Sequence, residues 1–416
     1  MNVISRIKNA SLYPLAYSIV ASQSVIARAK AFGKKPVVHF QKTYAGEKIL
    51  LIALYEKGRL RPDILNLLEA AKSTGLYVIA INTLKVLQPE SLQHRIDCYI
   101  ERPNFGRDFG SYQTGFMHLF KQGWEMQCPR LLMVNDSLFY SKENLAVFLE
   151  QMTNTDIEVL GATENHDFEY HLGSFCISFH KNILENKTFK KYWFNYKKSD
   201  VRPRVIQNGE LALSRALRRC ITSSEQMKAI FDTSWMTEQL QSDATILENV
   251  FYLNRDSDVF PWRKPSILEL VDKFESNFKL EYKKDSYFIK NNSHGESFIV
   301  ANITDYLSAL QKANMINDEE AVLRLIIDEL KSLVINCFSS GSQIHNFGLL
   351  LHHYGLPIIK TDAVYRGVFA ASDVEKIVRS LNADEIAQFR SLMFSRPYGG
   401  SHYFGWKRSA FVNGLI

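Results

Sequence analysis

The chain has 416 residues, which is too long for one typical core and predicts two domains. Hydrophobic residues make up 46% and charged residues 23% of the chain, a balance that excludes a disordered protein. The net charge of +6 suits anionic ligands such as nucleotide diphosphates or acidic lipid headgroups, and is too small for a nucleic-acid-binding protein.

The amino-terminal segment Ser11–Ala21 is apolar and has basic residues on both sides (Arg6, Lys8, Arg28, Lys30, Lys34 and Lys35). It contains no run of about 18 apolar residues, the length needed to span a bilayer, and it is too interrupted for a secretory signal. Two interpretations remain. The segment is either a basic amphipathic helix resting on a cytoplasmic membrane surface or a helix packed on its own domain.

Strand-length and helix-length patterns then alternate along the chain. Strands are expected at residues 49–55, 77–82, 98–101, 131–134 and 158–162, with a further strand-like stretch at 172–179. Helices are expected at residues 62–75, 111–122, 143–152, 187–198 and 210–219. This alternation predicts an α/β fold in which a mostly parallel sheet is flanked by helices.

Helical patterns dominate after about residue 235, notably at 318–334 and 371–379. We therefore expect an amino-terminal basic and apolar helical segment (1–45), a nucleotide-binding type of domain (46–245) and a mainly helical carboxyl-terminal domain (246–416). The five cysteines are scattered and form no CxxC pair, which indicates reduced thiols in a cytosolic compartment and argues against a zinc site.

The strand expected at 131–134 is followed directly by Asn135-Asp136-Ser137. The carboxyl ends of strands line the ligand crevice of such sheets, so Asp136 is a candidate metal ligand, with Asn135 and Ser137 as weaker oxygen donors. Alternatively, Asp136 caps the next turn, a role in which aspartate is common.

A polar loop with two glycines opens the helix expected from residue 111. Gly106 and Gly110 let backbone approach a ligand closely, and Arg107 can form paired hydrogen bonds with a phosphate. Asp108 can pair with Arg107 or bind a ribose or sugar hydroxyl. The alternative is an ordinary helix amino terminus with an exposed ion pair.

Glu210 and His171 are the remaining candidates. Glu210 lies at a loop-to-helix junction, where a glutamate is either a general base or an ordinary first-turn residue. His171 belongs to a polar cluster after the fifth strand, which contacts an acceptor or is simply a solvated loop.

Four motifs occur in the order used by the rhamnan synthesis protein F family, which the chain resembles over about residues 45–367. They are Asn104-Phe-Gly-Arg-Asp-Phe-Gly-Ser-Tyr112, Val134-Asn-Asp-Ser-Leu-Phe-Tyr140, His171-Leu-Gly-Ser-Phe175 and Asn208-Gly-Glu-Leu-Ala-Leu-Ser-Arg215. The segment Ile344–Lys360 is similar to that family's carboxyl-terminal signature. The family comprises bacterial glycosyltransferases of rhamnan, O-antigen and capsule assembly, with a GT-A-like sheet.

The resemblance implies a role for each candidate. Donor-binding positions would be Tyr55, Asn82, Asn104, Gly106, Arg107, Asp108 and Asn135, with Tyr55 and Asn82 flanking the nucleobase. Acceptor-side positions would be His171, Gly173 and Ser174. Asp136 would hold the metal and Glu210 would be the catalytic base.

Two motifs depart from the pattern of the wider inverting GT-A enzymes. The metal motif reads Asn-Asp-Ser rather than Asp-x-Asp, so one strong carboxylate remains. One carboxylate with diphosphate oxygens can still hold a water-rich Mg²⁺ or Mn²⁺. The base motif has Gly209 before Glu210, where an acidic residue is common.

The expected function is therefore an inverting glycosyltransferase in the cytoplasm, at the inner membrane face. It would transfer a sugar, such as rhamnose or another deoxyhexose, from a nucleotide-diphosphate donor to a lipid-linked or polymeric glycan acceptor of a bacterial surface polysaccharide. The alternative is a non-catalytic glycan- or nucleotide-binding protein that retains the fold. A phosphate-ester hydrolase is less favoured, because no nucleophile motif follows the first strand.

Overall fold

The computed structural model describes residues 3–166, 168–243, 245–253, 280–283, 288–291, 297–299, 319–369, 371–395, 398–400 and 402–416. The described residues up to 232 and from 341 onward form one compact unit, and those between 233 and 340 form a second. The predicted domain ranges 1–45, 46–245 and 246–416 remain a prediction. Residues 341–416 belong to the same unit as the large sheet.

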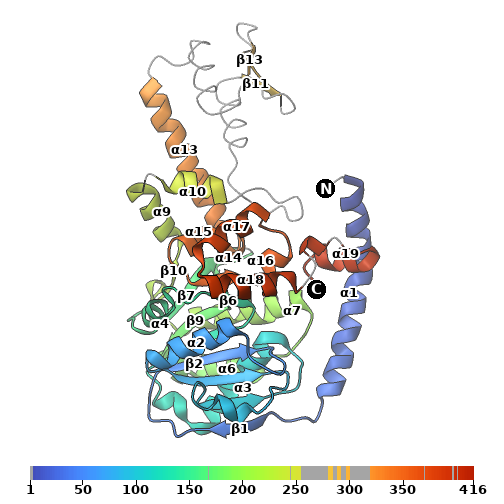
Figure 1. Ribbon diagram of the computed structural model, residues 1–416, viewed down its shortest axis with the longest axis vertical. Coiled ribbons are helices and arrows are strands. Elements are labelled where there is room, and N and C mark those ends of the chain that lie inside the picture. Colours follow the sequence, from blue (N-terminus) through green and yellow to red (C-terminus); the bar gives the residue numbers. More distant parts are fainter. Residues whose placement is uncertain are drawn as a thin grey trace. The chain divides into compact units, whose positions relative to one another are not determined.

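The first unit is built on a mixed sheet with the strand order β1-β4-β3-β2-β5-β9-β7-β10, and β8 pairs with β7 at one side (Figure 1). The strands are β1 (Val37–Gln41), β2 (Ile49–Leu54), β3 (Tyr77–Asn82), β4 (Cys98–Glu101), β5 (Arg130–Asn135), β7 (Val159–Asn165), β8 (His171–Leu172), β9 (Cys176–His180) and β10 (Met227–Phe231). Strands β4, β3, β2 and β5 are mutually parallel, and β9 runs antiparallel between β5 and β7. Strand β10 is parallel to β7.

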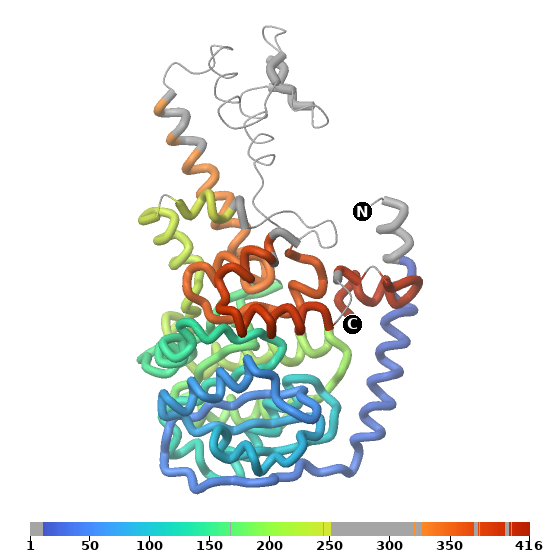
Figure 2. Tube along the Cα trace, viewed as in Figure 1, coloured from blue at the N-terminus to red at the C-terminus, as the bar shows by residue number. Residues whose placement is uncertain are grey.

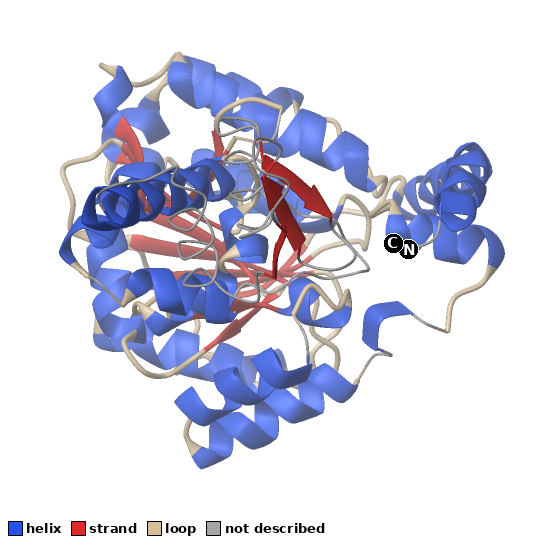
Figure 3. Cartoon of the chain, turned by 90° about the horizontal axis from the view of Figure 1, so that it is seen from above, coloured by secondary structure: helices blue, strands red, loops and turns tan. Residues whose placement is uncertain are grey.

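The central strands are mostly apolar because helices cover both faces of the sheet (Figure 3). Every residue of β2, β3 and β5 is buried. Helix α3 (Arg107–Gln122) contacts β2 and β3 on one face, where Leu51 packs in a core cluster with Phe116 and Trp193. Alternate residues of β2 point to the opposite face, where α2 (Pro62–Ser73) and α4 (Leu145–Thr153) contact each other.

The remaining helices and turns of the sheet region are short. They are η1 (Pro89–Leu92), η2 (Trp124–Met126), α5 (Lys181–Glu185), α6 (Lys187–Asn195), α7 (Arg202–Val205), a π-helical turn η3 (Ile206–Leu211), α8 (Ala212–Arg218) and η4 (Ser224–Gln226). The five cysteines are all free thiols.

The carboxyl-terminal segment returns to the sheet side of the first unit, as the red end of the trace shows (Figure 2). Strand β14 (Ile358–Lys360) pairs antiparallel with β6 (Leu138–Tyr140), so that Lys360 lies opposite Leu138. The helices of this segment are α14 (Gln343–Asn346), α15 (Gly348–His353), α16 (Thr361–Tyr365), α17 (Ala371–Ser380), α18 (Ala383–Phe394), η5 (Tyr398–Gly400) and α19 (Gly405–Val412).

The amino-terminal segment is a long helix, α1 (Val3–Ala31), that packs against α19 (Figure 1). The two helices share a small apolar cluster formed by Ala16, Val20, Val201, Ala410 and Leu415. One face of the helix therefore packs on its own unit, as the second interpretation of the sequence requires. Among the described residues, no helix is long and apolar enough to cross a membrane.

The second unit contains α9 (Thr233–Ser242), α10 (Ile246–Leu253), α13 (Glu319–Ser339) and a three-stranded antiparallel sheet. Its strands are β11 (Leu280–Lys283), β12 (Phe288–Asn291) and β13 (Ser297–Ile299). The aromatic rings of Trp235 and Phe338 lie 6.1 Å apart between α9 and α13.

The fold class predicted from the sequence is confirmed: a mostly parallel sheet flanked by helices, followed by a mainly helical carboxyl-terminal region. The sequence did not predict strands β1, β6, β10 and β14, which are five residues or fewer. Helix α3 begins at Arg107 rather than at residue 111. The earlier start arises because Gly106 and Arg107 both adopt positive φ values, 98° and 49°, which turn the chain sharply into the helix.

Candidate functional site

The carboxyl ends of the parallel strands bring several predicted site residues to one edge of the sheet. Tyr55 follows β2, Asn82 ends β3, and Asn135 and Asp136 end β5. Because β3, β2 and β5 are parallel neighbours, these residues lie side by side. The sheet thus brings together residues that the sequence placed at the ends of separate strands.

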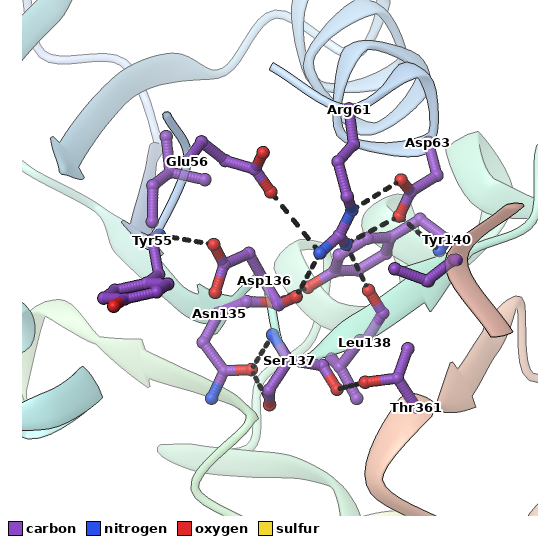
Figure 4. Close-up of polar contacts among 12 residues, drawn as sticks. Tyr55, Glu56, Arg61, Asp63, Asn135, Asp136, Ser137, Leu138, Tyr140 and Thr361 are labelled. Atoms are coloured by element: carbon purple, nitrogen blue, oxygen red, sulfur yellow. Dashed lines mark hydrogen bonds and ion pairs between the residues drawn. The ribbon is translucent and has the colours of Figure 1, made fainter. Parts of the chain in front are cut away.

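Asp136 is a nearly buried carboxylate, with 7% of the residue exposed. Its side chain accepts a hydrogen bond from the backbone N–H of Tyr55, and its own N–H donates to the Ala53 carbonyl at 3.1 Å (Figure 4). Burial, together with the negative charge of Asp108, raises the pKa of Asp136 to about 7. A bound cation would relieve both effects, because it would neutralise two carboxylates that repel each other.

A chain of hydrogen bonds links this motif to β14 on one side and to α3 on the other. The Lys360 Nζ donates to Ser137 Oγ at 2.8 Å, and this hydroxyl donates to Asn135 Oδ1 at 2.7 Å. The Asn135 Nδ2 in turn donates to Asp108 Oδ2 at 3.2 Å. Asn135 Oδ1 also accepts from the Ser137 N–H at 3.2 Å, so Asn135 closes the turn of this motif, while the Asp136 side chain bonds the backbone after β2.

Arg61 fixes the loop that carries Asp136, and sequence reasoning missed it (Figure 4). Its guanidinium donates to the Asp136 carbonyl at 2.9 Å and to the Leu138 carbonyl at 2.7 Å. It also pairs with both carboxylate oxygens of Asp63 at 3.0 Å and lies 3.4 Å from Glu56. Burial raises the pKa of Glu56 to about 7, although Arg61 acts in the opposite direction.

The loop between β4 and α3 is organised by Arg102, a buried guanidinium directly after the strand. It donates to the carbonyls of Pro103, Phe105 and Arg107 at 2.5–2.9 Å, and to Ser111 Oγ at 2.8 Å. These hydrogen bonds stabilise the loop conformation in which Gly106 and Arg107 have positive φ values.

Within this loop the predicted donor-binding residues have different surroundings. The Gly106 N–H donates to Asp200 Oδ1 at 2.6 Å, and a Cβ at this position would lie 2.8 Å from the Lys198 side chain. Asn104 and Arg107 are exposed. The Arg107 guanidinium forms no hydrogen bond or ion pair within the part of the chain that the structure describes. A non-glycine residue held at positive φ is strained, and such strain often marks a ligand site.

Tyr55 and Asn82, both predicted to flank a nucleobase, are placed differently. The Tyr55 ring is 56% exposed beside Asp136. Asn82 is fully buried, and its amide bonds the backbone of Glu56 at 3.0 and 2.8 Å and the hydroxyl of Tyr99 at 3.0 Å. Asn82 therefore shapes the loop after β2, while Tyr55 presents a ring to solvent.

Glu210 and His171, which are 39 positions apart in the sequence, lie together at a second side of the site. Their side chains approach to 3.9 Å between Nε2 and Oε2. Because His171 Nδ1 lies 2.8 Å from the Glu169 carbonyl, which can only accept, the imidazole hydrogen sits on Nδ1. The other ring nitrogen, Nε2, faces Glu210.

Glu210 belongs to the π-helical turn η3, a geometry that is rare and frequent at functional sites. The Tyr192 hydroxyl donates to the carbonyls of Asn208 and Gly209 at 3.2 and 3.1 Å, which compensates the widened turn. Gly209 lies against the Phe109 ring, where a Cβ would be 2.8 Å from a ring carbon. Close packing on Phe109 therefore accounts for a glycine where the wider enzyme class has an acidic residue.

Gly173, which is partly exposed, and the buried Ser174 form the turn between β8 and β9. The Gly173 N–H donates to the Thr163 carbonyl at 2.9 Å, and a Cβ there would lie 2.6 Å from the Phe175 ring. The Ser174 carbonyl accepts from the Tyr112 hydroxyl at 3.2 Å. These contacts hold His171 and Phe175 in place, so this turn supports the site.

Asp136 and Asp108 are the residues that fit a metal. They are the two carboxylates that meet at the sheet edge, and a water-rich Mg²⁺ needs no more than one or two protein carboxylates beside phosphate oxygens. Within the described ranges, no cluster of three or more histidine, cysteine, aspartate or glutamate side chains has the spacing of a metal centre. The donor set suits a hard cation shared with a phosphate ligand.

The fold and the site define an α/β protein with an acidic ligand site at the carboxyl edge of its parallel strands. The model of the rhamnan synthesis protein F family matches residues 76–312, more than half of the chain, and the chain belongs to this family. The matched range is shorter than the 45–367 expected, and it includes neither Tyr55 nor Lys360.

Two curated relatives are similar to part of the chain. "Uncharacterized protein y4gN" of Sinorhizobium fredii is 27% identical over 189 residues, which is 44% of this chain and 47% of the relative. "Virulence protein VirA" of Vibrio anguillarum is 29% identical over 145 residues, which is 34% of this chain and 46% of the relative. The chain therefore spans about half the length of the curated relatives it matches.

Two solved glycosyltransferases were also found. GlyE of Streptococcus pneumoniae TIGR4 is 11% identical, with 50% of this chain and 51% of that chain covered and a TM-score of 0.27. The mannosyltransferase PcManGT of Pyrobaculum calidifontis, solved with GDP-Man and Mn²⁺, is 9% identical, with 80% and 98% covered and a TM-score of 0.26. At these TM-scores the likeness adds nothing to what the sheet topology shows.

We predict that Arg61→Gln destabilises the protein by about 2–4 kcal/mol, because it leaves Asp63 and two loop carbonyls without their buried partner. Arg59→Gln is the matched control. Arg59 is exposed and two residues away, so its substitution should change stability by less than about 0.5 kcal/mol. Urea unfolding of both variants measures the difference. Equal stabilities would refute the structural role of Arg61.

Proposed function

We propose that this protein is a glycosyltransferase of bacterial surface-polysaccharide synthesis that uses a nucleotide-sugar donor. The observation that carries the proposal is the arrangement of charged groups around the loop Asn135–Ser137. Asp136 follows β5, Asp108 accepts a hydrogen bond from Asn135 Nδ2 at 3.2 Å, and Lys360 donates to Ser137 Oγ at 2.8 Å. Carboxylates that suit a metal and an ammonium that suits a phosphate thus lie around one loop.

On the donor side, the exposed Tyr55 ring would stack on the nucleobase, and Arg107 would contact the diphosphate. Asp136 and Asp108 would hold a divalent ion, which would supply positive charge to the leaving diphosphate. Asn135 keeps Asp108 oriented by its hydrogen bond. Asn104 and Gly106 would border the donor, and Asn82 would act through the loop that it holds.

On the acceptor side, Glu210 would accept the proton of the attacking hydroxyl. The new carbon–oxygen bond forms at the anomeric carbon as the bond to the diphosphate breaks, which inverts the configuration. His171 would orient the Glu210 carboxylate. Gly173 and Ser174, in the turn after β8, would hold His171 in position. The donor sugar would be rhamnose or another deoxyhexose, and the acceptor a lipid-linked or polymeric glycan of an O-antigen, capsule or rhamnan.

The proposed location is the cytoplasm, with peripheral contact to the inner membrane through α1. Val25 near the end of α1 and Phe32 in the turn directly after it are 66% and 86% exposed. Arg28, Lys30 and Lys34 are exposed around them. Apolar side chains ringed by cations suit a surface of anionic lipid.

A non-catalytic binding protein remains the second candidate, favoured by the motif Asn-Asp-Ser with its single carboxylate. Such a protein would bind a nucleotide or glycan without releasing a sugar. The following predictions separate the two candidates.

Asp136→Asn should keep the fold but abolish sugar transfer, because the amide retains the hydrogen bond from Tyr55 and loses the charge. A melting panel of UDP, GDP and dTDP with Mg²⁺ or Mn²⁺ should show stabilisation of about 2.7 kcal/mol for wild type at 100 times the dissociation constant. The shift should be lost in Asp136→Asn and kept in Asp156→Asn, an exposed control. A wild-type protein that no nucleotide stabilises would contradict the transferase.

Glu210→Gln should lower the rate of transfer by at least about 10²-fold while leaving nucleotide affinity unchanged, because only proton removal is lost. The exposed Glu225→Gln serves as control. Product formation from a panel of nucleotide sugars and a membrane-extracted glycan acceptor measures the rate. Nucleotide binding without any turnover in wild type would favour the binding protein instead.

Wild-type protein should float with vesicles that contain phosphatidylglycerol, and the double variant Val25→Asp/Phe32→Asp should stay in solution, because two exposed apolar residues at the end of α1 become acidic. Phe394→Asp changes an equally exposed aromatic residue elsewhere and should still float. Flotation of the double variant at wild-type level would remove α1 as the contact.

A further inference from the structure

Lys360 lies at the candidate site although it belongs to the carboxyl-terminal segment of the first unit. It ends β14, whose antiparallel pairing with β6 sets it opposite Leu138, and its partner Ser137 lies 223 positions earlier in the chain. The Thr361 hydroxyl donates to the Ser137 carbonyl at 2.8 Å, which fixes the same loop a second time. The position of the ammonium is therefore set by backbone pairing rather than by a flexible side chain alone.

The groups in direct contact with the Lys360 ammonium are neutral, and the carboxylates of Asp362, Asp108 and Glu210 act on it only from a distance. Its hydrogen-bond partner is the Ser137 hydroxyl at 2.8 Å, and the Phe175 ring centre lies 5.7 Å away. It forms no ion pair within the described part of the chain. A partly buried charge without a counter-ion costs free energy, and an anionic ligand would recover that cost.

The surroundings of Lys360 also place it where negative charge would arrive. Partial burial lowers the pKa of Lys360, against the attraction of Asp362 and Asp108. Asp362 already pairs with Arg202 at 3.2 Å and with Arg366 at 2.7 Å, so it is not available to neutralise Lys360 fully. Two arginines therefore share Asp362, and Lys360 is left without an ion pair of its own.

We propose that Lys360 contacts the diphosphate of the donor and neutralises it as the sugar leaves. The inference rests on the proposed function and deepens it. When the bond between the anomeric carbon and the diphosphate oxygen breaks, that oxygen keeps the electron pair, and the Lys360 ammonium lies beside the resulting charge. The acceptor oxygen forms the new bond, and its proton passes to Glu210.

The chemistry of the motif supports this assignment. In Asn135-Asp136-Ser137 a hydroxyl stands where a second carboxylate would hold more of a metal ion. That hydroxyl binds Lys360 instead. The motif thus has a fixed ammonium where a second carboxylate is absent. Part of the affinity for the diphosphate should therefore not require a metal.

The test is calorimetric titration in metal-free buffer with a chelator. The nucleoside diphosphate that stabilises wild type is compared with its uncharged nucleoside. Wild type should bind the diphosphate more tightly. Lys360→Gln should lose about tenfold in diphosphate affinity, the worth of one charge-assisted hydrogen bond, and keep its nucleoside affinity.

Two variants serve as controls. Lys360→Arg keeps the charge and should retain most of the preference, and Lys142→Gln removes an exposed lysine near the same strand and should change nothing. Unchanged nucleoside affinity also proves that the site is folded. If Lys360→Gln does not fold, Lys360→Met, which can pack on Phe175, replaces it and should show the same loss.

The outcomes separate this inference from the proposed function. Diphosphate affinity that is equal in wild type, Lys360→Gln and Lys360→Met would overturn the role of Lys360 and leave the transferase standing. Absence of any nucleotide binding in wild type would overturn both. A tenfold loss of nucleoside affinity as well would indicate a collapsed site and would also count against a specific phosphate contact.

Discussion

The partly buried guanidinium of Arg61 makes the contacts on which the site most depends. It satisfies two carbonyls of the loop that carries Asp136 while its own charge is balanced by Asp63 and Glu56. Removing such a group costs more than one hydrogen bond, because several buried partners are left unpaired. The loop is thus fixed before any ligand arrives, and Asp136 can be held close to another carboxylate without moving away from it.

Because the loop is rigid, its three consecutive residues can each contact a different part of the chain. Asp136 points to the backbone of Tyr55, Asn135 reaches Asp108 at the start of α3, and Ser137 meets Lys360 from β14. A flexible loop would average these contacts away. Because the loop is fixed, the motif joins the start of α3 to the end of β14, so that distant parts of the chain meet at one site.

The surroundings of Glu210 obey a different constraint, which is close packing. The π-helical turn displaces Glu210 from regular helical geometry, the Tyr192 hydroxyl donates to two carbonyls of the turn, and Gly209 lets the turn rest on Phe109. The core aromatic residues therefore set the position of the carboxylate that we propose as the base. A change in Phe109 would be felt at Glu210 through packing alone, since neither residue bonds the other.

The sequence alone determined the central strands, most of the flanking helices and the edge at which Asp136 lies, because apolar runs and helical spacing are local signals. It also picked out Glu210 and His171, although not that they meet. Arg61, Arg102 and Lys360 escaped it, since an arginine or lysine carries no local mark of the carbonyls or hydroxyls it will bind. Their partners are set by strand pairing and loop packing across the chain, and β14 joins β6 only when the whole unit has folded. The tertiary structure alone decided these contacts.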